Sequence, residues 1–133
     1  MEIIKEVLKK YKNIALVGAS KDLTKTSSVV MKYLQDYGFK VYPVNPSMKG
    51  ESILGEKVFG NIKEIDGPVE IVDIFRPSNE IAEIAKDAVK VNAKVLWLQL
   101  DIQNEEAKKI AEANNILYVE NKCTKIEFEK YFN

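Results

Sequence analysis

The fold of this chain is indicated most clearly by two neighbouring stretches, Ile14-Ala15-Leu16-Val17-Gly18-Ala19-Ser20-Lys21 and Lys25-Thr26-Ser27-Ser28. A short apolar run ends in Gly-Ala-Ser, a loop with two lysines and several hydroxyl groups follows, and helical periodicity then begins. This order predicts a buried strand, a tight turn and the start of a helix. The first N–H groups of a helix have no partner within the helix, and its dipole favours negative charge there. The stretch therefore predicts a phosphate site.

The rest of the chain continues the alternation of apolar runs and helical spacing. The apolar runs predict strands at residues 14–17, 40–44, 57–59, 69–75, 94–98 and 116–119. The spacing predicts helices at residues 1–12, 27–37, 79–92, 104–114 and 124–132, with a helical turn at 61–65. Gly38 is expected to end the second helix, and Ser78 to cap the third. The alternation favours one α/β domain over residues 1–133, a doubly wound parallel sheet of five to six strands with helices on both faces.

Composition narrows the classes of partner. The 133 residues include 20 Lys and Arg and 20 Asp and Glu, so the net charge is zero. A neutral chain does not predict binding to nucleic acid or to an anionic membrane, and no apolar segment is long enough to span a bilayer. No secretory signal pattern is present, and a single cysteine is typical of a reducing compartment. We therefore expect a cytoplasmic protein.

The residue types also limit the chemistry. The sequence contains no histidine, which is the commonest general base at neutral pH. Ser-His-Asp and Cys-His nucleophile systems are therefore excluded within this chain. The spacing of Asp22, Asp73 and Asp101 matches no metal-ligand motif, so no metal site is predicted. We name no catalytic residue.

The turns at the predicted strand ends indicate which nucleotide fits, because ligands of such sheets bind beyond the carboxyl ends of the strands. A nicotinamide or flavin dinucleotide would need Gly-x-Gly-x-x-Gly at the first turn and an acidic residue after the second strand. Here Gly18 stands alone, and the second strand ends in Val44-Asn45-Pro46. A Gly-x-x-x-x-Gly-Lys-Ser/Thr loop is also missing from the sequence. The pattern predicts an anionic nucleotide held by hydroxyl and lysine side chains, with an apolar slot at residues 44–46.

Short motifs follow one another in a fixed order over residues 10–132. They are Val17-Gly18-Ala19-Ser20, Lys25-Thr26-Ser27, Val41-Tyr42-Pro43-Val44-Asn45-Pro46, Leu54-Gly55-Glu56-Lys57-Val58-Phe59, Val72-Asp73-Ile74-Phe75-Arg76, Trp97-Leu98-Gln99-Leu100 and Asn121-Lys122-Cys123. Together they resemble the small stand-alone CoA-binding proteins, whose fold is similar to the CoA-binding domain of the succinyl-CoA synthetase α-subunit. The resemblance implies a Rossmann-like domain that binds coenzyme A without a general catalytic activity.

The resemblance also implies a set of binding residues. The phosphate site would be lined by Gly18, Ala19, Ser20, Lys25, Ser27 and Ser28. The adenine would be flanked by Val44, Asn45 and Pro46, and the side next to the fourth strand would be closed by Phe75 and Arg76. The chain departs from the family at Val29 and Asp101, where glycine is usual. Val29 would narrow the approach to the phosphates, and an inward Asp101 carboxylate would repel them.

Other functions stay open at this point. A non-catalytic module that binds CoA or an acyl-CoA is favoured. The alternatives are an NADP- or acyl-CoA-linked enzyme and an interaction protein regulated by a nucleotide. The amphipathic first helix is expected to pack on the sheet, or else to form the seam of a homodimer. Cys123 lies at the last strand end, and we consider the hypothesis that its thiol meets the thiol of bound CoA.

Overall fold

The computed structural model describes residues 2–77 and 79–133. Its main sheet has five parallel strands: β1 (Asn13–Val17), β2 (Lys40–Val44), β5 (Ile71–Ile74), β6 (Val95–Leu98) and β7 (Leu117–Val119). Their order across the sheet is β2-β1-β5-β6-β7. This is the doubly wound parallel sheet that the sequence predicts, with five strands in the main sheet.

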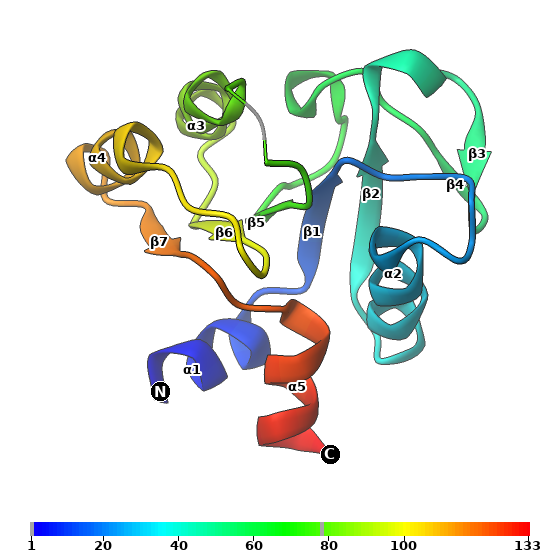
Figure 1. Ribbon diagram of the computed structural model, residues 1–133, viewed down its shortest axis with the longest axis horizontal. Helices are drawn as coiled ribbons and strands as arrows, with labels where there is room; N and C mark the ends of the chain where they lie inside the picture. Colours follow the sequence, from blue (N-terminus) through cyan, green and yellow to red (C-terminus); the bar gives the residue numbers. More distant parts are fainter. Residues whose placement is uncertain (1, 78) are drawn as a thin grey trace.

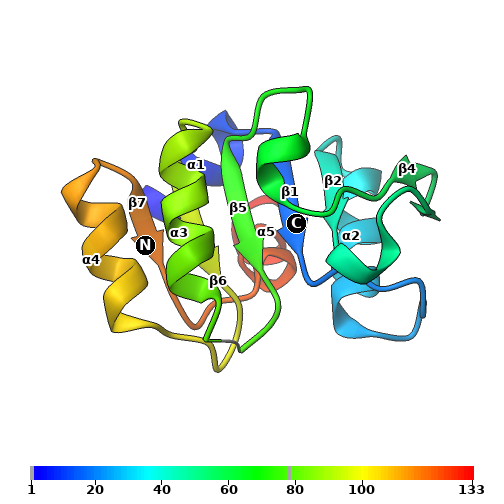
Figure 2. The same ribbon diagram turned by 90° about the horizontal axis from the view of Figure 1, so that it is seen from above.

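Five α-helices cover the two faces of the sheet, as predicted. They are α1 (Glu2–Lys10), α2 (Thr26–Asp36), α3 (Ile81–Lys90), α4 (Glu105–Ala113) and α5 (Thr124–Phe132). Figure 1 shows α3 and α4 on one side of the sheet and α1, α2 and α5 on the other. Figure 2 shows the same layers from above. Each layer buries its own apolar cluster, one below α3 and α4 and one below α1, α2 and α5.

The first helix packs within the molecule. Ile4, Val7 and Leu8 of α1 are buried in the cluster that α2 and α5 also cover, and α1 lies against α5. The apolar stripe of α1 is thereby used in the core, which is the first of the two roles expected for this helix.

The prediction of a sheet strand at residues 57–59 is wrong. Lys57 belongs to a two-stranded antiparallel hairpin of β3 (Ser52–Ile53) and β4 (Glu56–Lys57). Phe59 touches the main sheet through one parallel bridge to Val44, in which its N–H donates to the Pro43 carbonyl over 3.0 Å and its carbonyl accepts from the Asn45 N–H over 2.9 Å. The tight turn at residues 54–55 pairs Lys57 with Ser52 in the hairpin, so that only Phe59 makes ladder hydrogen bonds to β2.

Helix ends agree with the sequence in one case and differ in another. Gly38 adopts a φ of +93°, and the N–H of Phe39 reaches back to the Leu34 carbonyl, so α2 ends in the glycine motif that was predicted. The α3 helix starts at Ile81, later than residue 79, and the predicted cap Ser78 lies outside the described residues. Short 3-10 turns at η1 (Pro46–Met48) and η2 (Ile62–Glu64) complete the fold. Of the helices in the described ranges, none is long and apolar enough to cross a membrane.

The strand order creates a crevice at the carboxyl ends of β1 and β5. From β1 the chain turns to α2 on one face, and from β5 it turns to α3 on the other. Loops that leave neighbouring strands toward opposite faces leave a crevice between them, which is where ligands bind in such sheets. The predicted residues Gly18 and Arg76 follow these two strands.

Candidate functional site

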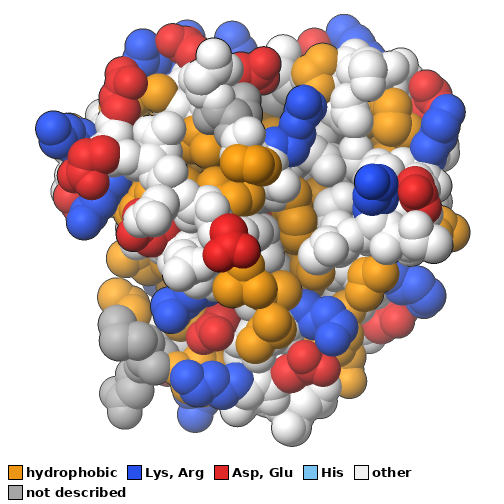
Figure 3. Space-filling view, in the orientation of Figure 1, with side chains coloured by type: hydrophobic (Ala, Val, Ile, Leu, Met, Phe, Trp, Pro, Cys, Tyr) orange, Lys and Arg blue, Asp and Glu red, His pale blue; other side chains and the backbone are white. Residues whose placement is uncertain are grey.

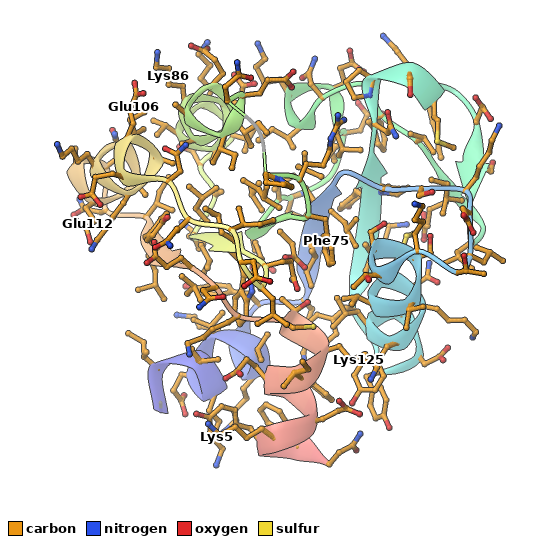
Figure 4. The ribbon with its side chains drawn as sticks, viewed as in Figure 1. Lys5, Phe75, Lys86, Glu106, Glu112 and Lys125 are labelled. Atoms are coloured by element: carbon orange, nitrogen blue, oxygen red, sulfur yellow. The ribbon has the colours of Figure 1, made fainter. Side chains whose placement is uncertain are left out.

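A polar pocket of about 640 Å³ lies at this crevice. It is formed by the turn after β1, the start of α2, the residues after β2 and the end of β5. Its lining includes eight predicted site residues: Gly18, Ala19, Ser20, Lys25, Ser27, Asn45, Phe75 and Arg76. Thr26 and Ser47, which were not predicted, also line it. Three parts of the chain that are far apart in sequence, residues 18–27, 45–47 and 75–76, thus build one pocket (Figure 4, where Phe75 is labelled).

Two side chains brace the turn between β1 and α2. The Asn45 side-chain amide donates to the Ala19 carbonyl over 2.9 Å, and the Ser28 hydroxyl donates to the Ser20 carbonyl over 2.7 Å. Both carbonyl oxygens are therefore engaged by the protein itself. Ser28 is buried and does not line the polar pocket, so it positions the turn, whereas the resemblance placed it at the phosphates.

The start of α2 offers unpaired donors to the polar pocket. The N–H groups of Ser28 and Val29 donate to the Lys25 carbonyl. Within the described part of the chain, the N–H groups of Thr26 and Ser27 have no such acceptor. Lys25 precedes the helix as its N-cap residue and makes no side-chain capping bond there. A helix start with free N–H groups and a positive dipole end is a site for an anion.

Two cationic side chains join these donors. Lys25 and Arg76 both line the polar pocket. Neither side chain takes part in an ion pair among the described side chains, those of residues 3–77 and 79–133. By contrast, Lys21 in the same loop lies 3.5 Å from a Glu51 carboxylate oxygen. The positive charges of Lys25 and Arg76 are thus open to a ligand, and a guanidinium matches the geometry of a phosphate.

Gly18 is required where the two loops meet. Its φ is +95°, and a Cβ atom built on it would lie 2.6 Å from Cγ of Arg76. A larger residue would therefore be strained in its backbone and would displace the arginine. The sequence predicts Gly18 in a tight turn, and the absence of a side chain there also leaves room for the Arg76 side chain to pack against this turn.

An apolar cavity of about 280 Å³ adjoins the polar pocket, with Gly18 and Arg76 lining both. It contains the predicted Val44 and Pro46. Its other lining residues are Val17, Gly60, Asn61, Ile62, Glu80, Glu83, Ile84 and Asp87. Three of these are acidic, and Glu83 and Asp87 pair with Lys86 and Lys63 at 3.1 and 3.6 Å. A flat apolar group with N–H donors suits such a cavity better than an anion does.

The two residues that depart from the family pattern lie away from both spaces. Val29 is exposed on the outer side of α2 and lines neither of them. Asp101 is exposed in the turn after β6, with a φ of +66°, and its N–H donates to the Asn121 side chain over 2.8 Å. Asp101 thus keeps the left-handed backbone that glycine adopts easily. Neither residue narrows the polar pocket or puts a charge into it.

A second polar group at this edge of the sheet is fully closed. Asp73 in β5 is buried, and it accepts hydrogen bonds from the Gln99 amide and, over 3.1 Å, from the Thr124 hydroxyl. Gln99 also donates to Thr124 over 3.1 Å. Burial raises the pKa of Asp73 to about 7, although both hydrogen bonds lower it. Gln99, which belongs to the Trp97-Leu98-Gln99-Leu100 motif, is part of this cluster, and the cluster ties β5, the end of β6 and the start of α5 together.

Cys123 is placed as a structural residue. Its side chain is buried in the apolar cluster below α1, α2 and α5. Burial raises the pKa of the thiol, although the N–H groups of Lys125 and Ile126 at the start of α5 lower it. A buried thiol with a raised pKa is a poor nucleophile. The geometry therefore speaks against the hypothesis that this thiol meets the thiol of CoA.

The sequence did not predict the acidic rim of the apolar cavity. Its three residues, Glu80, Glu83 and Asp87, lie in α3 or directly before it, on what the sequence treated as helix surface. The segment that leads into the η2 turn, treated as a connection, adds Gly60, Asn61 and Ile62 to the cavity. One feature of the sequence could have indicated this cavity: the two segments follow directly after Phe75-Arg76 and Phe59, next to the predicted strand ends. Their convergence depends on the bridge between Phe59 and Val44, which the sequence did not reveal.

Residues 12–129 match the family described as CoA binding domain. The chain belongs to this CoA-binding domain family. The uncharacterized protein YneT of Bacillus subtilis (strain 168) is 37% identical over 123 residues, which are 92% of this chain and 90% of that protein. The structure of a hypothetical protein from Pyrococcus horikoshii OT3 is 39% identical and covers 99% of this CoA-binding domain, with a TM-score of 0.95 and 92% of that chain matched.

The family also links the chain to larger proteins. The ADP-forming acetate–CoA ligase of Methanocaldococcus jannaschii is 29% identical over 83 residues. These residues are 62% of this CoA-binding domain and 12% of the ligase, so the match covers a small part of that protein. Membership of the family supports CoA binding in general, and it confirms the resemblance seen in the sequence.

Proposed function

We propose that this chain is a cytoplasmic, single-domain module that binds coenzyme A, or an acyl-CoA, at the carboxyl edge of its sheet without catalysing a reaction. The observation that carries the proposal is the junction at Gly18 and Arg76. Here a polar pocket with open positive charges meets an apolar cavity. A nucleotide with phosphates on one side and a base on the other fits this junction.

The phosphates belong in the polar pocket. The N–H groups of Thr26 and Ser27 and the side chains of Lys25 and Arg76 supply donors and positive charge there. The braces from Asn45 and Ser28 keep the carbonyl groups of the turn engaged, so that a phosphate meets donors and not acceptors. These features support anion binding through charge-assisted hydrogen bonds.

The adenine belongs in the apolar cavity. Val44, Pro46 and Ile84 provide apolar contacts, and the carboxylates at the rim can accept hydrogen bonds from the exocyclic amino group of the base. The same carboxylates would repel a phosphate placed in this cavity. The charge distribution of the two spaces therefore orients the nucleotide.

A non-catalytic role agrees with the chemistry of the lining. Asp73, whose pKa lies near neutrality, is closed off in its cluster and lines neither space. The groups of the polar pocket are hydroxyls, an amide, an amine and a guanidinium, which bind phosphate without an evident acid–base pair. On this proposal, an acyl-CoA incubated with the protein is recovered with its thioester intact.

Isothermal titration calorimetry with CoA, dephospho-CoA, NADP and ATP tests the proposal directly. We expect CoA to bind most tightly, and thermal unfolding to shift upward in its presence because the ligand binds the folded state. The Arg76→Ala variant should lose most of this affinity, whereas Lys21→Ala, which changes a lysine outside the pocket, should keep it. Tighter binding of NADP than of CoA, or no binding of CoA, would refute the proposal.

A further inference from the structure

The outer side of α2 carries an exposed apolar stripe. Val29, Tyr33 and Tyr37 follow one another along this side, with Lys32 and Asp36 between them. Val29 and Tyr37 are 45% and 43% exposed, although both are large apolar or aromatic side chains. In the described residues, the helices α3 and α4 of the opposite layer show no large hydrophobic side chain that is as exposed. The two layers of the protein therefore differ in how they meet solvent.

A groove of about 310 Å³ runs along this stripe, and we call it the α2 groove. It is lined by Leu23, Ser28, Val29, Lys32, Tyr33, Asp36, Leu54 and Lys125. Figure 4 shows Lys125 of α5 on the side of that helix that faces α2. The Lys125 amine lies 5.0 Å from the centre of the Tyr33 ring. The groove is thus formed by four segments: the β1–α2 loop, α2, the β3–β4 turn and α5.

Leu54 occupies an unusual position in this groove. Its φ is +48° in the two-residue turn of the hairpin, where Asn, Asp or Gly is favoured. A leucine in this conformation is strained. Its side chain packs at the edge of the core and also lines the α2 groove. The strained leucine therefore extends the apolar surface of the groove.

Along the α2 groove, each helix carries its basic residue before its acidic one, which is the less favourable order for a helix. Lys32 precedes Asp36 in α2, and Lys125 precedes Glu129 in α5, with ion-pair distances of 3.2 and 3.3 Å. An acidic residue N-terminal to a basic one would be more favourable in an isolated helix, and the helix dipole disfavours Asp36 in the last turn. The α2–α5 side therefore carries positive charge toward one end and negative charge toward the other.

We infer that the α2 groove binds a second copy of this chain, with the two α2 helices antiparallel about a two-fold axis near Tyr33. A surface with opposite charges at its two ends is complementary to itself only when a copy is turned by such an axis. Val29 then lies against Tyr37 of the second copy. Lys32 lies two residues along the helix, about 3 Å, from the level of Asp36 of the second copy, within reach of its flexible side chain. The zero net charge of the chain adds no repulsion between the copies.

Charge reversal provides a sharp test. Lys32→Glu places two carboxylates opposite each other across the axis, and Asp36→Lys places two amines there. Each variant alone should dimerise about tenfold more weakly than the unaltered protein in sedimentation velocity experiments. An equal mixture of the two variants should regain dimers, because each carboxylate then meets an amine in the other variant.

Controls separate this inference from folding and from the proposed function. Glu112→Lys reverses an exposed charge on α4, in the opposite layer (Figure 4), and should leave the dimer unchanged. All variants should unfold at similar temperatures, because exposed ion pairs contribute little to stability, and they should bind CoA normally. A monomeric unaltered protein throughout the micromolar range, or a mixture that fails to regain dimers, would overturn the inference without affecting the proposal of CoA binding.

Discussion

Two polar regions lie at the carboxyl edge of the sheet, and their central members, Asp73 and Arg76, are three positions apart in the sequence. Arg76 lines the open polar pocket, where its charge has no carboxylate partner among the described residues. Asp73 belongs to a closed cluster in which Gln99 and Thr124 satisfy its oxygens. Figure 3 shows hydrophobic side chains gathered through the middle of one face of the molecule, with most of the charged side chains around them. Polarity at a strand end therefore does not identify a ligand site. A ligand site is indicated by hydrogen-bond donors and charges that are open to solvent and have no partner within the protein.

The largest effect is expected from Asp73→Asn, and it concerns stability. The pKa of Asp73 is about 7 in the folded protein, against about 3.9 when unfolded. Between these values the folded state holds a proton that the unfolded state has released. The free energy of unfolding should therefore fall as pH rises through this range, by about 1.4 kcal/mol per pH unit from this group. Urea unfolding from pH 4 to 8 measures the slope, which the variant should lack.

The exposed Asp22 offers a contrast to Asp73. Hydrogen bonds from Thr24 lower the pKa of Asp22, so its contribution to the pH dependence has the opposite sign. Asp22→Asn should leave the falling slope between pH 4 and 7 in place. CoA affinity at pH 8 should be nearly the same in Asp73→Asn as in the unaltered protein, and a large loss would contradict the separation of the two regions.

Arg76→Ala should have the reverse pattern, with lost affinity and unchanged stability. A hydrogen bond to a charged group contributes about 1.5–3 kcal/mol, which corresponds to a rise in the CoA dissociation constant of about 10- to 100-fold. Arg76→Lys should recover part of the affinity, because it keeps the charge but not the bidentate geometry. Calorimetric titration measures both, and an unchanged constant for the alanine variant would remove Arg76 from the site.

The role of Gly18 can be isolated with a matched glycine. Gly18 and Gly38 have φ values of +95° and +93°, but a Cβ atom meets Arg76 only at Gly18 and nothing within 4 Å at Gly38. Either change to alanine should lower the free energy of unfolding by about 1–2 kcal/mol because of backbone strain. Gly18→Ala alone should also weaken CoA binding. Equal CoA affinity in the two variants would show that the close approach of Arg76 is not needed.

The smallest effect is expected from Lys25→Ala. An exposed charge contact contributes up to about 1 kcal/mol, or roughly a fivefold change in the dissociation constant. The neighbouring Lys21, which already pairs with Glu51, serves as the comparison, and Lys21→Ala should change the constant less. The difference should shrink at high salt, because screening weakens exposed charge contacts. Identical constants for both variants would argue against a role of Lys25 at the phosphates.

Much of the fold could be predicted because its signals are local. Each strand of the main sheet is an apolar run, and the turn at Gly38 needs a residue that tolerates a positive φ. The failure at residues 57–59 has a local cause as well. The turn at Leu54-Gly55 makes a hairpin, but leucine is not a usual residue for such a turn, so the signal was weak.

The local sequence pattern is enough to predict the doubly wound sheet. Through the turn after β1 and the residues after β2 and β5, it also predicts most of the residues that line the polar pocket. These follow from periodicity and from the rule that ligands bind at the carboxyl ends of parallel strands. Which polar residues face solvent, and which satisfy one another's hydrogen bonds, depends on the tertiary packing. Ser28 and Gln99 turned inward as braces, and acidic residues of α3 met the end of β2 at the apolar cavity. Partnering and burial depend on contacts between distant segments, which no local pattern encodes.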